Sequence, residues 1–228
     1  MMDGQPASVD DAASLLASQR TYYDERAEDY GDVSRPDRNS PGLMNPEVCR
    51  ALIDEFRPTG DVLELACGTG AFTGDIVQHA QSLTAVDASP RMLAINRRRV
   101  NDSKVTYVTS DIFAWEPDRA YDAVFFGFWL SHVPPTAFDG FWALVQGCLA
   151  PHGHVAFVDE DDRAAGHDDT YSIDGLPAAR RTLSDGRQFE IVKVFWRPDE
   201  LEHRLRTSGW DINVRRVGET FLYGTGHT

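Results

Sequence analysis

Three acidic side chains stand at or near the ends of apolar stretches, and they are the first candidates for chemistry. Glu64, Asp87 and Asp111 each lie within or just after a short run of β-branched and other apolar residues. Gly68 and Gly70 form a turn after the first of them. The carboxyl ends of parallel strands meet at one edge of a sheet, so we expect the acids to line one pocket. Such a pocket is rich in hydrogen-bond acceptors and suits a ligand with hydroxyls, amines and positive charge.

The glycine turn differs from the two common phosphate-binding turns. A dinucleotide-binding turn has a third glycine near position 73, where this chain has Thr73. A nucleoside-triphosphate loop ends in Gly-Lys-Ser, which is absent from this turn. The turn therefore does not indicate phosphate binding, and a nicotinamide-dependent oxidoreductase is a disfavoured alternative.

Alternating strands and helices must position these acids. The predicted strands cover residues 61–65, 83–86, 104–108, 121–128 and 153–158. A helix is predicted over 71–80, Ser89 and Pro90 begin a second, and Thr136 with Asp139 has the spacing of a capping box before a third. A helix from Pro198 precedes two closing strands at 210–217 and 221–226. This order predicts a doubly wound, Rossmann-like α/β fold with a mainly parallel seven-stranded sheet and helices on both faces.

Two segments lie outside the alternating pattern. Residues 10–30 are predicted to form an amphipathic helix, followed by a loop to Pro46, and we expect residues 1–45 to act as a lid over a domain spanning 46–228. An insertion at about 160–196 follows the fifth strand. Its first part, within the acidic stretch 159–174, is predicted to be a loop, and 180–196 is predicted to be a hairpin that turns at 184–187.

The composition limits the partners that are expected. The 228 residues include 22 basic and 36 acidic ones, a net charge of −14, which disfavours nucleic acid and anionic membranes. The three cysteines contain no CxxC pair, as expected for a reducing compartment. The first twenty residues lack a signal pattern, and the longest apolar run, 123–130, is too short to span a bilayer. We expect a cytoplasmic monomer or homodimer.

Histidines and clustered acids do not require a metal here. His152 and His154 flank a glycine in a predicted turn, and the acids at 159–162 resemble a solvated loop. No metal site is predicted.

Four short motifs together resemble the class I S-adenosylmethionine-dependent methyltransferase family. They are ELACGTG (64–70), LTAVDAS (83–89), TSDIF (109–113) and YDAVFFGFWLSHVP (121–134). The resemblance extends over roughly residues 20 to 226. It implies S-adenosyl-L-methionine as the cofactor. One departure is Ala66, which stands where the family often has glycine, so an unusual backbone conformation cannot be assumed at this position.

The resemblance also implies roles for individual residues. Asp87 would accept both ribose hydroxyls, and Asp111 would accept from the exocyclic amine of adenine. The other residues implied to hold the cofactor are Glu64, Ala66, Gly68, Gly70, Ala88, Met92, Ile112 and Phe126.

Aromatic residues in three separate segments are candidates for the acceptor pocket. Methyl transfer from a sulfonium disperses positive charge, which aromatic faces can stabilise, and alignment in a water-poor site supplies most of the acceleration. The candidate acceptor-binding residues are Tyr22, Tyr23, Phe128, Trp129 and Trp196.

His132 follows the fourth predicted strand and is the candidate catalytic base. A neutral imidazole could take a proton from an acceptor hydroxyl or amine. In the Ser-His-Val-Pro turn the same side chain could instead serve only to hydrogen-bond the backbone. Both interpretations remain open at this point.

The favoured function is methyl transfer to an oxygen or nitrogen of a small aromatic or apolar molecule. A nucleic-acid amino-methyltransferase would carry an Asn/Asp-Pro-Pro-aromatic motif after the fourth strand, where this chain has Phe-Gly-Phe-Trp. The alternative is a protein that binds S-adenosylmethionine but acts as a sensor or catalyses another reaction.

Overall fold

A seven-stranded sheet forms the centre of the protein, which is described here by a computed structural model covering residues 9–30, 45–167 and 169–228. From edge to edge its strands are β3 (Val105–Thr109), β2 (Ser82–Asp87), β1 (Asp61–Leu65), β4 (Tyr121–Gly127), β5 (Leu149–Glu160), β10 (Phe221–His227) and β9 (Asp211–Val217). Strands β1 to β5 pair in parallel, while β10 is antiparallel to both β5 and β9. The predicted fold class and strand positions are confirmed. The predicted loop over 31–44 lies outside the described residues.

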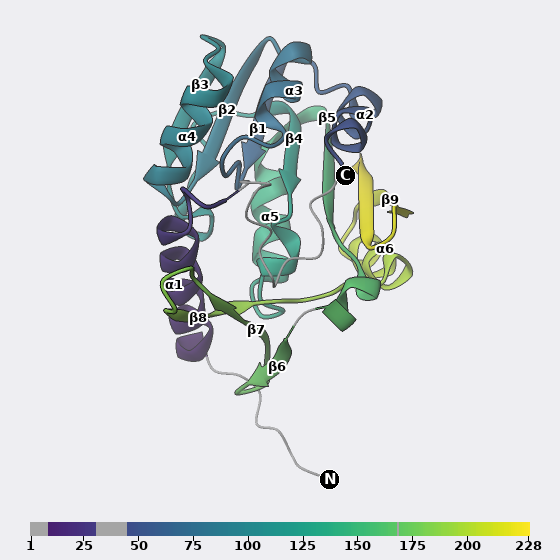
Figure 1. Ribbon diagram of the computed structural model, residues 1–228. Helices are drawn as coiled ribbons and strands as arrows, with labels where there is room; N and C mark the ends of the chain where they lie inside the picture. The colour runs from purple at the N-terminus through teal and green to yellow at the C-terminus, as the bar shows by residue number, and fades with distance from the viewer. Residues whose placement is uncertain (1–8, 31–44, 168) are drawn as a thin grey trace.

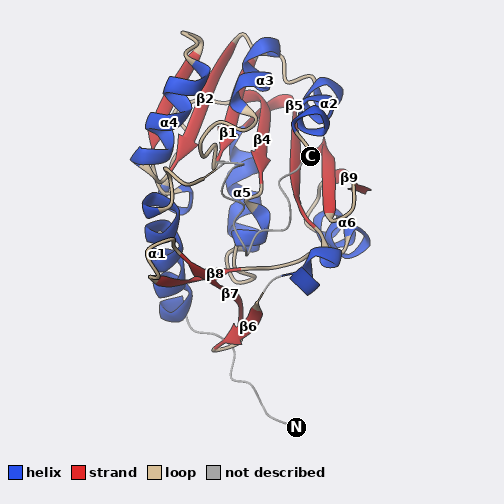
Figure 2. Cartoon of the chain, viewed as in Figure 1, coloured by secondary structure: helices blue, strands red, loops and turns tan. Residues whose placement is uncertain are grey.

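Helices cover both faces of this sheet (Figure 2). They are α2 (Pro46–Phe56), α3 (Thr73–His79), α4 (Pro90–Val100), α5 (Phe138–Cys148) and α6 (Pro198–Thr207). Alternate residues of a strand point to opposite faces. Leu63 and Leu65 accordingly pack in one cluster with residues of α5 and α6, and Val62 packs in another with α2 and α3. Glu64 shares the parity of Val62 and therefore lies on the α3 side.

The N-terminal caps of the helices were predicted correctly in one case and not in two others. The Ser89 hydroxyl accepts from Met92 N at 3.0 Å, the predicted N-cap of α4. Helix α2 was not predicted, although Asn45 caps it and Pro46 is its first residue. The predicted capping box of α5 is wrong, because that helix begins at Phe138 with Ala137 at the N-cap and no side-chain cap.

A second, three-stranded sheet lies in the insertion after β5. It consists of β6 (Thr170–Ile173), β7 (Leu176–Thr182) and β8 (Gln188–Val192), all antiparallel. The predicted hairpin lies within it as β7 and β8. The prediction of a loop over 159–174 is wrong, since this stretch holds the end of β5, the short helix η3 (Asp162–His167) and β6. Its acidic character partly serves packing, because buried Asp161 is paired with Arg163 and Arg216.

The N-terminal helix α1 (Val9–Glu25) packs on the small sheet. Its Leu15 is buried with Leu176 and Val192, and its Tyr22 with Ile191. Figure 1 shows α1 and the small sheet beneath the large sheet, at the end toward which the arrowheads of β2 and β4 point. This arrangement brings α1 to the edge where the three acids were expected. Within the described ranges, no helix has both the length and the apolar character needed to cross a membrane.

Candidate active site

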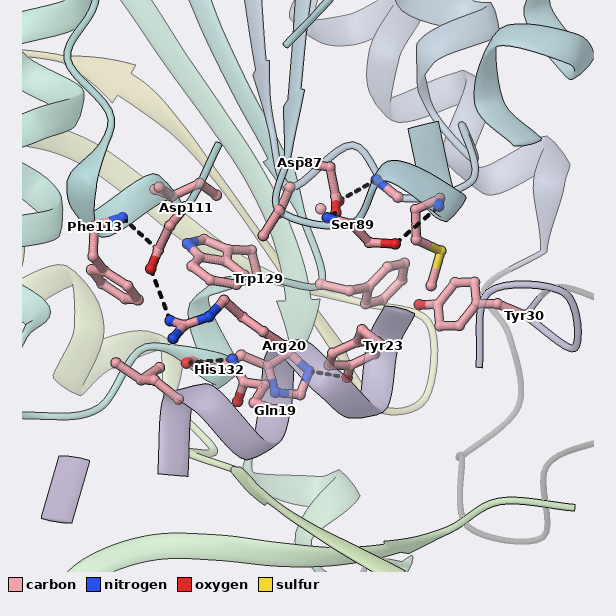
Figure 3. Close-up of a pocket in the computed structure, with 18 residues that line it drawn as sticks. Gln19, Arg20, Tyr23, Tyr30, Asp87, Ser89, Asp111, Phe113, Trp129 and His132 are labelled. Atoms are coloured by element: carbon pink, nitrogen blue, oxygen red, sulfur yellow. Dashed lines mark hydrogen bonds and ion pairs between the residues drawn. The ribbon is translucent and has the colours of Figure 1, made fainter. Parts of the chain in front are cut away.

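A pocket lies between the carboxyl ends of the parallel strands and α1 (Figure 3). About 730 Å³ of empty space, part of it open solvent, lies within this pocket. The structure brings together eleven of the predicted site residues in its wall: Tyr23, Ala66, Gly68, Asp87, Ala88, Met92, Asp111, Ile112, Phe128, Trp129 and His132. The N-terminal segment and the segment after β4 thus meet at the strand ends, whereas none of the described residues of the insertion lines the pocket.

Asp87 is held in place by backbone donors. Its two carboxylate oxygens accept from Gly68 N at 2.9 Å and from Ser89 N at 2.8 Å. Burial raises the pKa of Asp87, and these backbone hydrogen bonds partly offset that rise. Each carboxylate oxygen offers more than one acceptor site, so Asp87 can still accept from hydroxyls of a ligand.

The turn after β1 has a left-handed backbone at three of its residues. The φ angles are 53° at Ala66, 50° at Gly68 and 86° at Gly70. Ala66 thus has a left-handed conformation that the sequence alone did not allow us to assume. A Cβ at Gly70 would lie 2.6 Å from Oδ1 of Asn96 in α4, so the turn is packed closely against that helix. Phe128, on the other side of the pocket, also has a positive φ of 55°. Such strained residues persist where the surrounding structure holds them.

Glu64 lies just below the pocket wall rather than in it. Its side chain is buried, and among the described residues Oε2 has no hydrogen-bond partner. Burial raises the pKa of Glu64 to about 8, a hydrogen bond from Thr73 lowers it, and the negative charge of Asp87 raises it. A buried acceptor without a donor is costly, so this atom is suited to receive a cationic or N–H group of a ligand.

Asp111 joins the sheet to α1. Oδ1 accepts from Phe113 N at 3.1 Å, and Oδ2 forms a 2.8 Å ion pair with Nη1 of Arg20. Beside it the rings of Phe113 and Trp129 lie 5.7 Å apart between centroids. The acid therefore borders an apolar slot that Met92 also lines.

His132 lies in the short helix η2 (Leu130–His132) and is buried, with 6% of its surface exposed. Nδ1 is 2.9 Å from the Val192 carbonyl oxygen, and Nε2 is 2.9 Å from Oη of Tyr23. A carbonyl oxygen only accepts, so Nδ1 carries the hydrogen and the lone pair of Nε2 accepts from Tyr23. Burial, and next the positive charge of Lys193, lower the pKa of His132 well below its usual value. The imidazole is thus neutral, with a defined tautomer.

Five predicted site residues are not part of the pocket wall. Glu64 and Gly70 do not line it, and Phe126 lies on the face of the sheet that packs against α5 and α6, where its ring stacks on Phe157 at 5.3 Å. Tyr22 packs against Phe189 at 5.8 Å and Trp196 against Phe138 at 5.1 Å. The acceptor roles predicted for Tyr22 and Trp196 are not supported by these positions. Successive side chains point about 100° apart on a helix and about 180° apart on a strand. Tyr22 and Phe126 therefore point away from the pocket, although each is next in sequence to a residue that lines it.

Sequence reasoning missed seven residues of the wall: Leu16, Gln19, Arg20, Tyr30, Ser89, Phe113 and Gly127. Three of these could have been found from helix geometry. Leu16, Gln19 and Arg20 precede Tyr23 by seven, four and three positions, which is the spacing of one helical face. Ser89 and Phe113 are close in sequence to residues that were predicted.

Comparison with known proteins agrees with this geometry. The family model described as a methyltransferase domain matches residues 62–153. The solved structure of a DhpI complex with SAH is 40% identical, with a TM-score of 0.79, and the match covers 93% of this chain and 96% of that one. The chain belongs to the class I S-adenosylmethionine-dependent methyltransferases. A DhpI complex with SAM and HEP matches at the same identity and TM-score, over 94% of this methyltransferase and 98% of that chain. S-adenosylmethionine is therefore the cofactor of this enzyme.

More distant relatives support the family and the fold. Nodulation protein S of Sinorhizobium fredii is 28% identical over 116 residues, which are 48% of this methyltransferase and 53% of that relative. The match thus spans about half of the length of that curated relative. The 1,6-didemethyltoxoflavin-N1-methyltransferase of Burkholderia thailandensis is 18% identical, with a TM-score of 0.67, over 98% of this chain and 92% of that one. At this identity the likeness concerns the fold alone.

Proposed function

We propose that this methyltransferase transfers a methyl group to an oxygen or nitrogen of a small aromatic or apolar molecule bound beneath α1. The observation that carries the proposal is the neutral His132, hydrogen-bonded to Tyr23, in the same pocket as Asp87 and Asp111. A proton acceptor and a cofactor-binding set thus share one enclosed space. The complex of DhpI with SAM and HEP, a protein 40% identical to this one, supports a site that admits a second ligand beside the cofactor.

The residues below and around the pocket fit the cofactor. The buried Oε2 of Glu64, which has no partner among the described residues, suits the cationic amino group of the methionine portion. Asp87 accepts from the ribose hydroxyls and Asp111 from the adenine amine, while Met92 and Ile112 pack on the ring. When bound, the cofactor supplies a methyl group activated by the positive charge on sulfur.

The acceptor occupies the side of the pocket formed by Tyr23, Phe128, Trp129 and His132. Aromatic faces there stabilise nearby positive charge and exclude water. Holding the acceptor atom in line with the methyl group supplies most of the acceleration. The neutral Nε2 of His132 provides the place to which the acceptor's proton finally moves. Helix α1 covers this side, in keeping with a lid role for residues 1–45.

The proposal is tested by screening a library of hydroxyl and amine compounds for release of S-adenosylhomocysteine. We expect release that depends on the acceptor, with apolar and aromatic compounds preferred. The matched control is Asp87→Ala, which should bind the cofactor more weakly and therefore release less S-adenosylhomocysteine when the cofactor is below saturation. If the protein binds S-adenosylmethionine but releases no S-adenosylhomocysteine with any compound, the sensor alternative is favoured instead.

A further inference from the structure

The nitrogen of His132 that could act as a base is covered by a tyrosine hydroxyl. Nδ1 donates to Val192, so only Nε2 can take a proton, and Tyr23 Oη already donates to it (Figure 3). Both residues line the pocket, but Tyr23 is half-buried, whereas only 6% of the surface of His132 is exposed. An acceptor in the pocket therefore meets the tyrosine oxygen before it meets the histidine.

We propose that Tyr23 is a catalytic residue that receives the acceptor's proton on its hydroxyl oxygen while its own proton passes to Nε2 of His132. This inference rests on the proposed methyl transfer to oxygen or nitrogen. It gives α1 a chemical role in addition to that of a cover.

The ring of Tyr23 is held from several sides. Its centroid is 5.1 Å from that of Tyr22, 5.4 Å from that of His132 and 6.2 Å from that of Tyr30, each in an edge-on arrangement. A hydroxyl that passes a proton must be oriented toward both its donor and its acceptor. The packing of three rings around Tyr23 supplies that orientation.

A second residue of α1 fixes the position of Tyr23 relative to His132. Gln19, one helical turn before Tyr23, accepts from Val192 N at 3.1 Å through Oε1 and donates to the His132 carbonyl oxygen at 3.4 Å through Nε2. The same side chain thus joins α1 to β8 and to η2. Residues four apart lie on one helical face, so this contact also holds the Tyr23 hydroxyl at the imidazole.

The proton transfer balances with the methyl transfer. The bond between sulfur and the methyl carbon breaks, and its electron pair stays on sulfur, while the acceptor's lone pair forms the new bond to that carbon. The acceptor's proton moves to Tyr23 Oη, and the proton of Tyr23 moves to His132 Nε2. One positive charge is lost at sulfur and one appears on the imidazole, so the net charge of the site does not change. This balance allows a buried histidine to serve as the final base, because no additional charge is buried.

The kinetic test compares Tyr23→Phe with a second variant that loses a tyrosine hydroxyl outside the pocket. Tyr171→Phe is that control, since the Tyr171 hydroxyl donates to Glu190 in the small sheet and is outside the pocket. Under single-turnover conditions we expect Tyr23→Phe to slow methyl transfer about 100-fold, with cofactor affinity within about threefold, and Tyr171→Phe to leave the rate unchanged. A Tyr23→Phe rate equal to wild type would overturn the proposal.

Two further measurements separate a proton relay from a structural role. Because the pair acts as one unit, Tyr23→Phe combined with His132→Gln should lose no more activity than the slower single variant. If the two rate reductions multiply in the double variant, the relay is contradicted.

In isolated cofactor-free protein, the ¹⁵N resonance of His132 Nε2 should shift in Tyr23→Phe and stay in place in Tyr171→Phe. An unchanged Nε2 resonance in Tyr23→Phe would show that the hydrogen bond is absent and would also overturn the relay.

The outcomes for the relay and for the proposed function differ. Wild-type protein that releases no S-adenosylhomocysteine with any acceptor contradicts the function and with it the relay. Wild-type turnover that survives Tyr23→Phe contradicts the relay alone. Wild-type turnover that falls about 100-fold in Tyr23→Phe, and no further in the double variant than in the slower single variant, supports both the proposed function and the relay.

Discussion

The proposed cofactor side of the pocket, around Asp87, and the proposed acceptor side, around Tyr23 and His132, are built in different ways. On the cofactor side, Asp87 is held by backbone donors from its own loop and from the turn after the neighbouring strand. On the acceptor side, Tyr23 and His132 are 109 residues apart, and His132 and Val192 are 60 apart. The first arrangement follows from the edge of one sheet, whereas the second requires three separate elements to dock.

This difference suggests which side can change. Backbone hydrogen bonds at a strand end persist as long as the sheet persists. The outer contacts of α1 include exposed ion pairs, such as Glu25 with Arg187 at 3.0 Å and with Arg91 at 3.7 Å, and contacts of this kind are worth little individually. The acceptor side thus depends on the docking of α1, whereas the cofactor side depends on the edge of one sheet. The predictions below test this separation.

Removing residues 1–30 should have the largest effect on turnover. The deletion takes away Tyr23 and Gln19, and we expect methyl transfer to fall below detection while the large sheet stays folded. Cofactor affinity, measured by calorimetry, should stay within about tenfold because Asp87 is retained. Deleting only residues 1–8 is the control and should leave turnover intact. Full activity in the longer deletion would contradict the division into two sides.

Asp87→Ala should produce the converse result. Loss of a charge-assisted acceptor should weaken cofactor binding by about 1.5–3 kcal/mol, or roughly 10- to 150-fold, without unfolding the protein. Calorimetric titration with S-adenosylhomocysteine measures this. Asp139→Ala on α5, an exposed acid paired with Arg204, is the matched control and should bind normally. Equal affinities in the two variants would show that the acid of β2 does not hold the ligand.

The raised pKa of Glu64 predicts that both cofactor affinity and folding stability depend on pH. Its pKa is raised to about 8, above the ordinary value of 4.5, so the folded protein holds an extra proton between these pH values. Folding stability should therefore fall as pH rises through that interval, and Glu64→Gln should raise the melting temperature by several degrees at pH 9 but little at pH 4. Cofactor affinity of wild type should rise toward pH 8, because the cationic amino group favours ionised Glu64.

The Gln variant supplies the control for the binding part of this prediction. Its cofactor affinity should be weaker at pH 8 and should lack the rise that wild type shows. An affinity of wild type that is constant between pH 6 and 8 would mean that Glu64 does not contact the amino group.

Ala66→Gly should have the smallest effect. Glycine accepts a φ of 53° without steric cost, and this gain should exceed its larger unfolded-state entropy by up to about 1 kcal/mol. Thermal unfolding should show a melting temperature about 2–4 °C higher, with cofactor affinity unchanged. Ala71→Gly, an exposed position without a positive φ, should instead be neutral or destabilising. A loss of stability in Ala66→Gly would argue that the turn is not strained.

Much of the cofactor side could be read from the sequence because its signals are local. The order of strands and helices, the Ser89 cap and the positions of Asp87 and Asp111 depend on residues within a few positions of one another. Errors arose where a local pattern had two readings. The spacing of Thr136 and Asp139 suggested a capping box, but the helix begins at Phe138, and Asn45 with Pro46 was not recognised as a helix start.

The acceptor side was decided by tertiary structure. The sequence by itself indicated that Tyr22, Tyr23 and His132 were candidates, but not which tyrosine faces the pocket, since that depends on how α1 is rotated on the small sheet. The tautomer of His132 is set by a carbonyl group 60 residues away, and the turn at Gly68 and Gly70 is packed against Asn96 of α4. Periodicity and caps are properties of neighbouring residues, so a sequence records them directly. Contacts between distant segments depend on the simultaneous packing of all elements, and only the folded chain determines them.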